Sequence, residues 1–242
     1  MEKWEQIQKR FQEAGLVLSE KQAGQFAAYA ELLVQWNEKM NLTSITDFDE
    51  ILEKHFLDSL AAAIRPVLPP DVWKGNLVDV GTGAGFPGIP LKIFYPDLKV
   101  TLLDSLNKRV GFLNQVMGEL GLKKITAVHG RAEDLARDPR YREQFGLCVS
   151  RAVAALPVLA EYCLPFVRRG GFLVAYKSGQ VEEELTQGGK AVKVLGGSLQ
   201  KTEKFVLPGT DISRSLVLIR KVENTPKKYP RKAGTPAKQP LG

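Results

Sequence analysis

The first part of the chain has apolar residues at the spacing of amphipathic helices. Residues that share one face of the first helical pattern are Trp4, Ile7, Phe11 and Ala14. Ser19 followed by Gln22 is a capping box, which predicts the start of a second helix. A third helical pattern runs over residues 50–64 and ends before a proline. Residues 1–70 are therefore predicted to form an N-terminal helical extension.

From residue 77 onward, short apolar runs alternate with amphipathic stretches. Six runs have the length and composition of buried strands, namely 77–81, 99–104, 125–130, 147–152, 171–177 and 215–221. Five helical stretches lie between them, around 88–94, 107–120, 132–143, 153–167 and 180–191. This alternation is typical of a parallel sheet covered by helices on both faces. We therefore predict an α/β domain with a Rossmann-like, mostly parallel sheet over residues 71–222.

Residues 223–242 form a basic, proline-rich tail. From Asn224 onward the chain contains four prolines, five Lys or Arg residues and no acidic residue. Such a segment is most simply a solvated and poorly ordered tail, although its charge also suits an arm that binds phosphates. The net charge of +7 and the pI near 9.3 favour a polyanionic partner over a small neutral substrate.

The chain has no pattern typical of export, membrane insertion or metal binding. The start, MEKWEQIQKRF, is charged and amphipathic, and no later apolar run is long enough to cross a bilayer. We therefore expect a cytoplasmic protein. Cys148 and Cys163 lack CxxC spacing and are expected to be buried free thiols. Two histidines and two scattered cysteines supply too few ligands for zinc, so no metal site is predicted.

The stretch VDVGTGAGFPGIPL places Gly81, Gly83 and Gly85 directly after the first predicted strand, at the sheet edge where ligands bind. A dinucleotide-binding loop has the spacing G-x-G-x-x-G, but here the third glycine comes one residue early and Phe86 stands in its place. The GxGxG spacing, with Asp79 two residues before it, resembles motif I of the S-adenosylmethionine-dependent methyltransferases. A tight turn that binds no ligand is the simpler alternative.

Acidic residues follow two later strands at the same edge. Asp104 ends the second strand, where a carboxylate can accept hydrogen bonds from both hydroxyls of a ribose. Ala132 and Glu133 follow the third strand, where an adenine would meet a backbone group and a side-chain acceptor. Favourable charge at a helix N-terminus is the alternative reason for Glu133. Gly83, Asp104 and Glu133 are therefore predicted cofactor residues.

The fourth strand ends in Ser150, Arg151, Ala152 and Val153, which bears on the atom that is methylated. Enzymes that methylate exocyclic amines often place an Asn/Asp/Ser-Pro-Pro-aromatic motif here, and cytosine C5 methylation requires a cysteine nucleophile. The sequence has neither device at this edge. An acceptor such as guanine N7, which has a lone pair and no proton, needs neither. Arg151 suits a cofactor carboxylate or a phosphate, with a surface ion pair as the alternative.

Several blocks of sequence occur together in one known family. The blocks are NLTSI, HFLDSL, DVGTGAGFPGIPLKI, LLDSLNKRVGFL, HGRAED, SRAVA and the basic ending TPKKYPRKAGTPAKQPL. In this order they resemble the bacterial 16S rRNA guanine-N7 methyltransferases, also called the glucose-inhibited division protein B family. The resemblance implies a class I methyltransferase fold with a seven-stranded sheet, and methyl transfer to N7 of a guanine in a conserved loop of small-subunit rRNA. It also implies S-adenosylmethionine contacts at Gly81, Phe86, Ala132, Glu133 and Arg151.

Candidate RNA contacts come from charge and from position near the sheet edge or in the tail. They are Asn41, Thr43, His55, Lys108, Arg109, Lys177, Lys227, Lys228 and Arg231. His55 is given no catalytic role, because attack by N7 requires no general base. We expect a monomer that binds 16S rRNA or the small ribosomal subunit and does not bind DNA. Two other functions stay open: a non-catalytic RNA-binding assembly factor, and a small-molecule methyltransferase with the helical extension as a lid.

Overall fold

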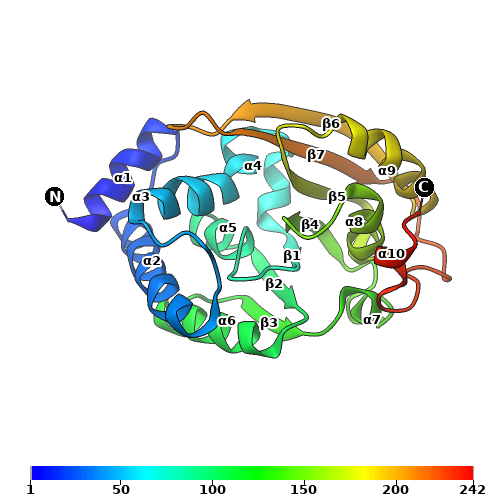
Figure 1. Cartoon of the computed structure of the whole chain (residues 1–242), viewed down its shortest axis with the longest axis horizontal. Coiled ribbons are helices and arrows are strands. Elements are labelled where there is room, and N and C mark those ends of the chain that lie inside the picture. Colours follow the sequence, from blue (N-terminus) through cyan, green and yellow to red (C-terminus); the bar gives the residue numbers. More distant parts are fainter. Residues whose placement is uncertain (1, 242) are drawn as a thin grey trace.

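The computed structural model describes residues 2–241. The N-terminal helices lie at one end of the molecule and the C-terminus at the other (Figure 1). The N-terminal elements are α1 (Lys3–Glu13), α2 (Glu20–Met40), α3 (Phe48–Glu50), the π-helix η1 (Ile51–Leu57), α4 (Ala61–Ile64) and the 3-10 helix η2 (Pro70–Lys74). The predicted capping box is present, because the Ser19 hydroxyl accepts a hydrogen bond from the Gln22 amide.

The third predicted helix, over residues 50–64, is not one continuous α-helix. Its first half is η1, a π-helix, and a turn at Leu60 interrupts the helix before α4. The carbonyls of Lys54 and His55 in η1 accept hydrogen bonds from Arg151 Nη1 at 3.1 and 3.5 Å. The spacing of apolar residues does not separate an α-turn from a π-turn over so short a stretch, so the sequence predicts the helix but not its type.

Within residues 2–241 the sheet has seven strands in the order β3-β2-β1-β4-β5-β7-β6, and β7 runs antiparallel to both β5 and β6. The strands are β1 (Asn76–Val80), β2 (Lys99–Asp104), β3 (Ile125–His129), β4 (Phe145–Arg151), β5 (Val167–Ser178), β6 (Gly197–Val206) and β7 (Ser213–Lys221). The six predicted strands are confirmed, as is the mostly parallel Rossmann-like sheet. The apolar pattern does not reveal β6, because this edge strand is largely polar and partly exposed.

Helices connect the parallel strands and cover the two faces of the sheet (Figure 1). They are α5 (Gly88–Phe94), α6 (Asn107–Glu119), α7 (Ala132–Leu135), α8 (Leu156–Cys163), the 3-10 helix η3 (Leu164–Phe166) and α9 (Glu182–Val194). α7 ends well before its predicted end, and Pro139 disfavours helical backbone at the residue before it. α8 begins at Leu156, later than predicted, with Pro157 in its first turn. The left-handed φ of 57° at Ala152 is incompatible with helical backbone at the predicted start.

Alternate residues of the central strands pack into separate apolar layers on the two faces of the sheet. Leu77 and Val149 belong to the layer that includes the N-terminal helices, and Val78 and Cys148 belong to the layer under α8. Cys148 and Cys163 are buried free thiols, as predicted. Within residues 2–241, no helix combines the length and the apolarity needed to span a bilayer.

The C-terminal segment is fixed to the body of the protein. It includes α10 (Thr235–Lys238), which packs against α8 (Figure 1). Arg142 donates hydrogen bonds to the main-chain carbonyls of Thr225 and Tyr229. Arg231 forms an ion pair with the fully buried Glu161. The expectation of a poorly ordered tail is therefore wrong, because composition does not show that partners distant in the sequence are placed to hold it.

Candidate active site

The glycine loop lies between β1 and α5, at the carboxyl edge of the sheet. Gly81, Gly83 and Gly85 have φ angles of 71°, 61° and 102°, which disfavour side chains. A Cβ on Gly81 would lie 2.5 Å from Val153 Cγ2, and a Cβ on Gly85 would lie 2.6 Å from Tyr29 Oη. A Cβ on Gly83 would meet nothing within 4 Å. The outer two glycines are therefore required for packing, and the middle one leaves bare backbone open to a ligand.

A buried carboxylate holds the glycine loop from inside the protein. Asp79 Oδ2 accepts hydrogen bonds from the Thr82 hydroxyl at 2.7 Å and from the Gly88 amide at 2.8 Å. Burial raises the pKa of Asp79 to about 7, against the lowering effect of these hydrogen bonds. Its Oδ1 is buried and has no hydrogen-bond partner among the described residues. A perturbed carboxylate beneath a bare loop is typical of a ligand-binding edge.

Asp104, at the end of β2, also contacts the glycine loop. Its Oδ2 accepts a hydrogen bond from the Gly83 amide at 2.9 Å, and its Oδ1 accepts one from the Leu106 amide at 2.9 Å. Arg109 Nη1 lies 3.5 Å from the same Oδ2. Asp104 is thus at the predicted edge, where it supports two turns of backbone. Each carboxylate oxygen can accept a second hydrogen bond, so a ribose contact stays a prediction.

A cavity of about 160 Å³ lies beside Gly81 and the start of α7. Ala132 and Glu133 line it and are both buried. Glu133 Oε1 accepts a hydrogen bond from the Gly234 amide at 2.8 Å, so the C-terminal segment reaches this cavity. Tyr162 of α8 also lines it, and burial, together with the nearby Glu133 charge, raises the pKa of Tyr162. A carboxylate in the wall of this cavity suits the amino edge of a purine.

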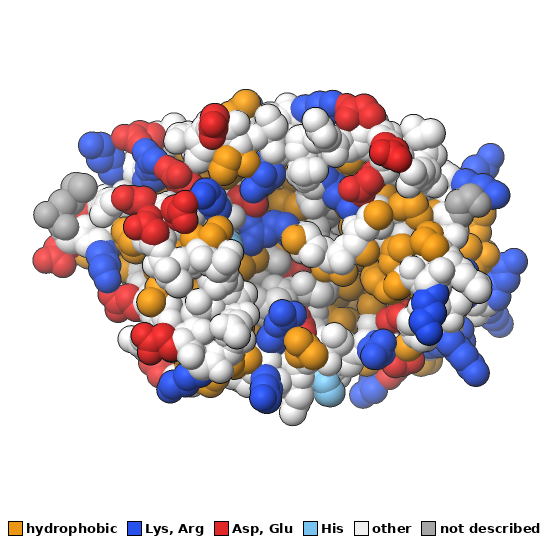
Figure 2. All heavy atoms as spheres, in the orientation of Figure 1, with side chains coloured by type: hydrophobic (Ala, Val, Ile, Leu, Met, Phe, Trp, Pro, Cys, Tyr) orange, Lys and Arg blue, Asp and Glu red, His pale blue; other side chains and the backbone are white. Residues whose placement is uncertain are grey.

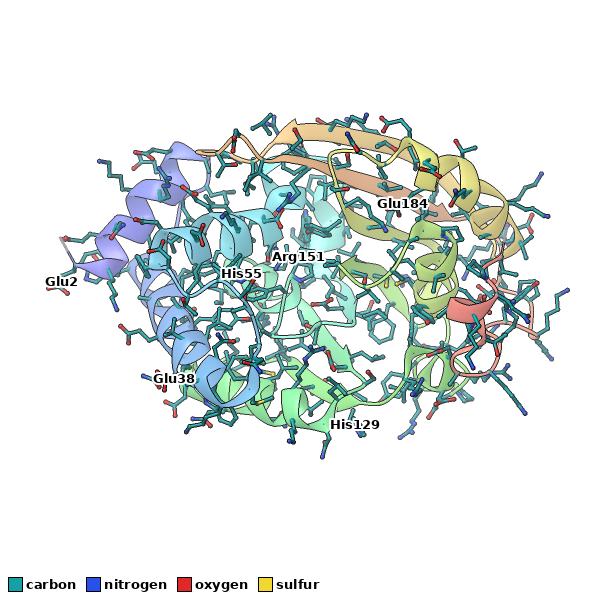
Figure 3. The ribbon with its side chains drawn as sticks, in the orientation of Figure 1. Glu2, Glu38, His55, His129, Arg151 and Glu184 are labelled. Atoms are coloured by element: carbon teal, nitrogen blue, oxygen red, sulfur yellow. The ribbon has the colours of Figure 1, made fainter. Side chains whose placement is uncertain are left out.

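Arg151, at the end of β4, joins the sheet edge to the N-terminal helices. Its guanidinium lies 5.0 Å from the centre of the Phe86 ring, and the His55 ring stacks on Phe86 with centroids 4.6 Å apart. Arg151 Nη1 donates to Asp58 Oδ2 at 2.7 Å, and Asp58 Oδ1 accepts from Arg214 Nε at 3.0 Å. Figure 3 shows Arg151 and His55 close together in the middle of the molecule. The fold therefore brings three predicted residues, from the loop before α5, from β4 and from η1, into one cluster.

His55 is held in its neutral form. Its Nε2 lies 2.8 Å from Thr43 Oγ1, within hydrogen-bond distance. Burial and the charge of Arg151 lower the pKa of His55 to about 4. Its Nδ1 is buried and lacks a hydrogen-bond partner among residues 2–241. An imidazole with so low a pKa is a weak base, which suits a supporting residue better than a proton acceptor.

A second cavity, of about 680 Å³, adjoins the first at Val153, which lines both. Arg151, Lys177 and Glu184 are among the residues around it. Lys177 Nζ lies 2.6 Å from the Ala154 carbonyl oxygen and 2.6 Å from Glu184 Oε2. Figure 2 shows a hollow in the middle of this face, with Lys and Arg side chains in and around it. The volume is in the range of small-molecule sites and is large enough for a nucleotide base.

The candidate RNA contacts divide into two groups. Exposed residues are Asn41, Lys108, Lys227 and Lys228. The others make contacts within the protein: Thr43 with His55, Arg109 with Asp104, Lys177 with Glu184, and Arg231 with Glu161. Lys177 lies at the larger cavity, where it holds the loop after β4. Arg231 pairs with a buried carboxylate, and its role in RNA binding stays a prediction.

Two residues of the site are not indicated by the sequence pattern. Tyr29 of α2 is fully buried, and its hydroxyl donates to the Ala84 carbonyl at 2.5 Å. Arg214, at the start of β7, shares Asp58 with Arg151. Helical spacing predicts that Tyr29 faces the core, but its partner depends on how α2 packs on the loop. Among residues 2–241, no three His, Cys, Asp or Glu side chains are grouped as metal ligands would be.

Comparison with known sequences gives one consistent result. A family model described as rRNA small subunit methyltransferase G matches residues 22–217. The chain is 50% identical over 230 residues to the ribosomal RNA small subunit methyltransferase G of Alkaliphilus metalliredigens, covering 95% of each protein. It is 53% identical to the protein of the same name from Lachnoclostridium phytofermentans, over 94% of this chain and 93% of that protein.

Comparison with solved structures supports the fold. A protein assigned as an O-methyltransferase from Klebsiella pneumoniae matches with a TM-score of 0.53 at 14% identity, covering 81% of this chain and 90% of that one. The fibrillarin pre-rRNA processing protein of Methanococcus jannaschii matches with a TM-score of 0.50 at 15% identity, covering 67% and 74%. At these identities the likeness concerns the fold alone, which is that of the class I S-adenosylmethionine-dependent methyltransferases.

Proposed function

The chain belongs to the rRNA small subunit methyltransferase G family, and from this premise we propose that it methylates N7 of guanine 527 in 16S rRNA, using S-adenosylmethionine. Membership makes the chain an rRNA methyltransferase. The methylated atom, the position of the guanine and the use of the cofactor by this chain are the proposed parts. A ribosomal substrate also implies a cytoplasmic location.

The observation that carries the choice of N7 is the state of the ionisable groups around the larger cavity. Asp58 pairs with both Arg151 and Arg214, and Glu184 pairs with Lys177. The pKa of His55 is lowered to about 4. Both carboxylates are thus engaged in ion pairs, and the imidazole is a poor proton acceptor at neutral pH. Guanine N7 attacks with a free lone pair and loses no proton, so it fits this lining better than an exocyclic amine does.

S-adenosylmethionine supplies a methyl group activated by a sulfonium, and the smaller cavity with the glycine loop fits its parts. Gly81 and Gly83 would present bare backbone to it, and Asp104 would accept hydrogen bonds from the ribose hydroxyls. Ala132 and Glu133 would bind the adenine edge. The orphaned Asp79 Oδ1 beneath the loop and the open space at Gly83 both support a ligand here.

Arg151 and Phe86 would bound the methionine part of the cofactor. The face of an aromatic ring attracts cations, and a guanidinium binds carboxylates through paired hydrogen bonds. Arg151 is held by Asp58 and by carbonyls of η1, so its position is fixed before any ligand binds. Because a displacement at carbon depends chiefly on alignment, such fixed groups are what the reaction requires.

The proposal is tested with labelled cofactor and two forms of the substrate. Naked 16S rRNA and small ribosomal subunits, both from cells that lack the protein, are incubated with methyl-labelled S-adenosylmethionine. We expect label in one guanine, at N7, mapped by chemical cleavage of the strand at the modified base. Label at another atom, or no label in either substrate, would contradict the proposal.

Gly83→Val provides the matched inactive variant. The valine side chain would occupy the open space beside the loop, and the backbone at this position would have to keep a positive φ, which valine disfavours. Cofactor binding should therefore be lost while the fold is retained. Binding is measured by calorimetry with S-adenosylhomocysteine. If the wild-type protein binds both cofactor and RNA without turnover, the non-catalytic assembly factor is favoured instead.

A further inference from the structure

The C-terminal segment contacts Glu133 in the wall of the smaller cavity, although its basic composition suggests only a solvated arm. We infer that residues 225–238 form a strap that supports the adenine end of the cofactor pocket from behind Glu133, and that Arg231 positions Glu133 through this strap. The inference rests on the proposed function, because it takes the smaller cavity to hold the adenine. The resemblance connects Glu133 with the cofactor, but no residue of the strap.

A hydrogen bond joins the strap to a residue of the pocket wall. The Gly234 amide donates to Glu133 Oε1 at 2.8 Å, across 101 residues of sequence. Glu133 is 5% exposed, and no other hydrogen bond to its side chain is made by the described residues. Oε1 is therefore held by the strap, and Oε2 is left to accept a hydrogen bond from the ligand.

Arg231, three residues before Gly234, anchors the strap to α8. Its main-chain amide donates to Glu161 Oε1 at 2.7 Å, and its guanidinium donates to both carboxylate oxygens, with Nη2 at 2.6 Å from Oε2. Glu161 is fully buried. A charge-assisted, two-pronged pair of this kind fixes orientation as well as distance.

Neighbouring contacts keep the rest of the strap in place. Arg137 donates to the Pro230 carbonyl at 2.5 Å, and Arg142 donates to the carbonyls of Thr225 and Tyr229. Glu161 is followed in α8 by Tyr162, which lines the cavity that Glu133 lines. The residue that binds Arg231 and a residue of the pocket wall are thus neighbours in α8. A strap that is no longer held by Arg231 would also no longer hold Glu133 in place.

A fixed carboxylate at this position would discriminate between purines. The adenine 6-amino group donates a hydrogen bond to Glu133 Oε2, whereas the 6-oxo group of hypoxanthine would face the carboxylate with a second acceptor. If Arg231 positions Glu133, then loss of Arg231 weakens the binding of the adenosyl ligand and reduces this discrimination. A variant that only loosens the fold would weaken both ligands alike.

The test measures the affinity of two ligands for the full chain by calorimetry. S-adenosylhomocysteine and S-inosylhomocysteine are titrated into the wild type, Arg231→Ala and the control Lys232→Ala, whose side chain is exposed. We expect Arg231→Ala to bind the adenosyl ligand about tenfold more weakly and to lose most of its preference for this ligand over the inosyl ligand. This is the effect of losing one charge-assisted hydrogen bond, here the bond from the adenine amino group to Glu133. Lys232→Ala should match the wild type.

A double-variant cycle separates positioning from general damage. In a Glu133→Ala background, Arg231→Ala should cause little further loss of affinity, because the group it positions is gone. Additive losses, or an unchanged adenosyl preference in Arg231→Ala, would overturn the inference. If Arg231→Ala does not fold, Arg231→Lys is used in its place, because lysine keeps the charge but cannot donate to both carboxylate oxygens as the planar guanidinium does. A wild type that binds neither ligand would instead refute the proposed function.

Discussion

Tyr29 supports the glycine loop through one buried hydrogen bond. Tyr29→Phe would remove the hydroxyl that donates to the Ala84 carbonyl, at a site with no exposure to solvent. We expect the free energy of unfolding in urea to fall by about 1–3 kcal/mol, and S-adenosylhomocysteine to bind more weakly because the loop loses a support. Tyr95→Phe is the matched control, because the half-buried Tyr95 stacks on Trp73 instead. Equal effects in the two variants would contradict this role.

His55 makes stability depend on pH in a defined window. Its pKa is about 4 in the folded protein, against an ordinary value of 6.5. Between these values the unfolded chain binds a proton that the folded chain does not, so the stabilisation is complete above pH 6.5 and is lost as the pH falls toward 4. The loss attributable to His55 is on the order of 3 kcal/mol across that window.

The pH dependence is measured by urea unfolding at about pH 7 and about pH 5, on either side of the ordinary histidine pKa. His55→Gln should lose less stability than the wild type over this interval, because the titrating group is gone. His129→Gln is the control, since His129 is the only other histidine and is exposed. A wild-type slope retained in His55→Gln would show that another group causes the dependence.

Asp58 links three elements, because it follows η1 and pairs with Arg151 of β4 and Arg214 of β7. Asp58→Ala would leave two guanidinium groups close together without their shared carboxylate. We expect a loss of about 3–5 kcal/mol in unfolding free energy, as for other broken buried ion pairs. Asp97→Ala breaks the exposed pair with Lys124 and should cost less than about 1 kcal/mol. Similar losses in both variants would argue against the link.

Elements with an apolar face could be predicted from the sequence, and elements without one could not. α5 and β2 match their predicted bounds, because the apolar periodicity and the residues that end each element indicate the same limits there. β6 has few apolar positions, since it lies at the edge of the sheet and faces solvent. The π-helical form of η1 depends on tertiary hydrogen bonds, including those from Arg151, which no local pattern encodes.

The same limit applies to the candidate site. Gly81, Asp104 and Arg151 lie at the ends of strands, and the edge at which parallel strands end is fixed by topology, so their proximity could be predicted. Lys177 and Arg231 are candidates for RNA binding because of their charge, and charge does not show whether a partner is near. Both are paired with carboxylates, Glu184 of α9 and Glu161 of α8.

The molecule as a whole surrounds one sheet edge with segments from both ends of the chain. The N-terminal helices reach it through His55 and Asp58, and the C-terminal segment reaches it through Gly234. The two ends lie at opposite sides of the molecule in Figure 1. A polyanion bound across this face would therefore lie close to segments from both ends of the chain, and the net charge of +7 favours such a partner.

The exposed lysines of the C-terminal segment give the last prediction. Lys227 and Lys228 are exposed on the segment that contacts Glu133, so their charges are open to the phosphates of a bound RNA. Replacing both by Gln should weaken RNA binding and reduce the slope of log affinity against log salt by about 1 for each phosphate that the protein no longer binds. Affinity is measured by fluorescence anisotropy with a fragment of 16S rRNA at several salt concentrations.

The control replaces two exposed lysines at the other end of the molecule, Lys9 of α1 and Lys21 of α2, by Gln. This variant has the same net charge as the first, so long-range attraction is matched and only local contacts differ. We expect its salt slope to equal that of the wild type. If both pairs change the slope equally, RNA is attracted by overall charge and the C-terminal segment makes no phosphate contact of its own.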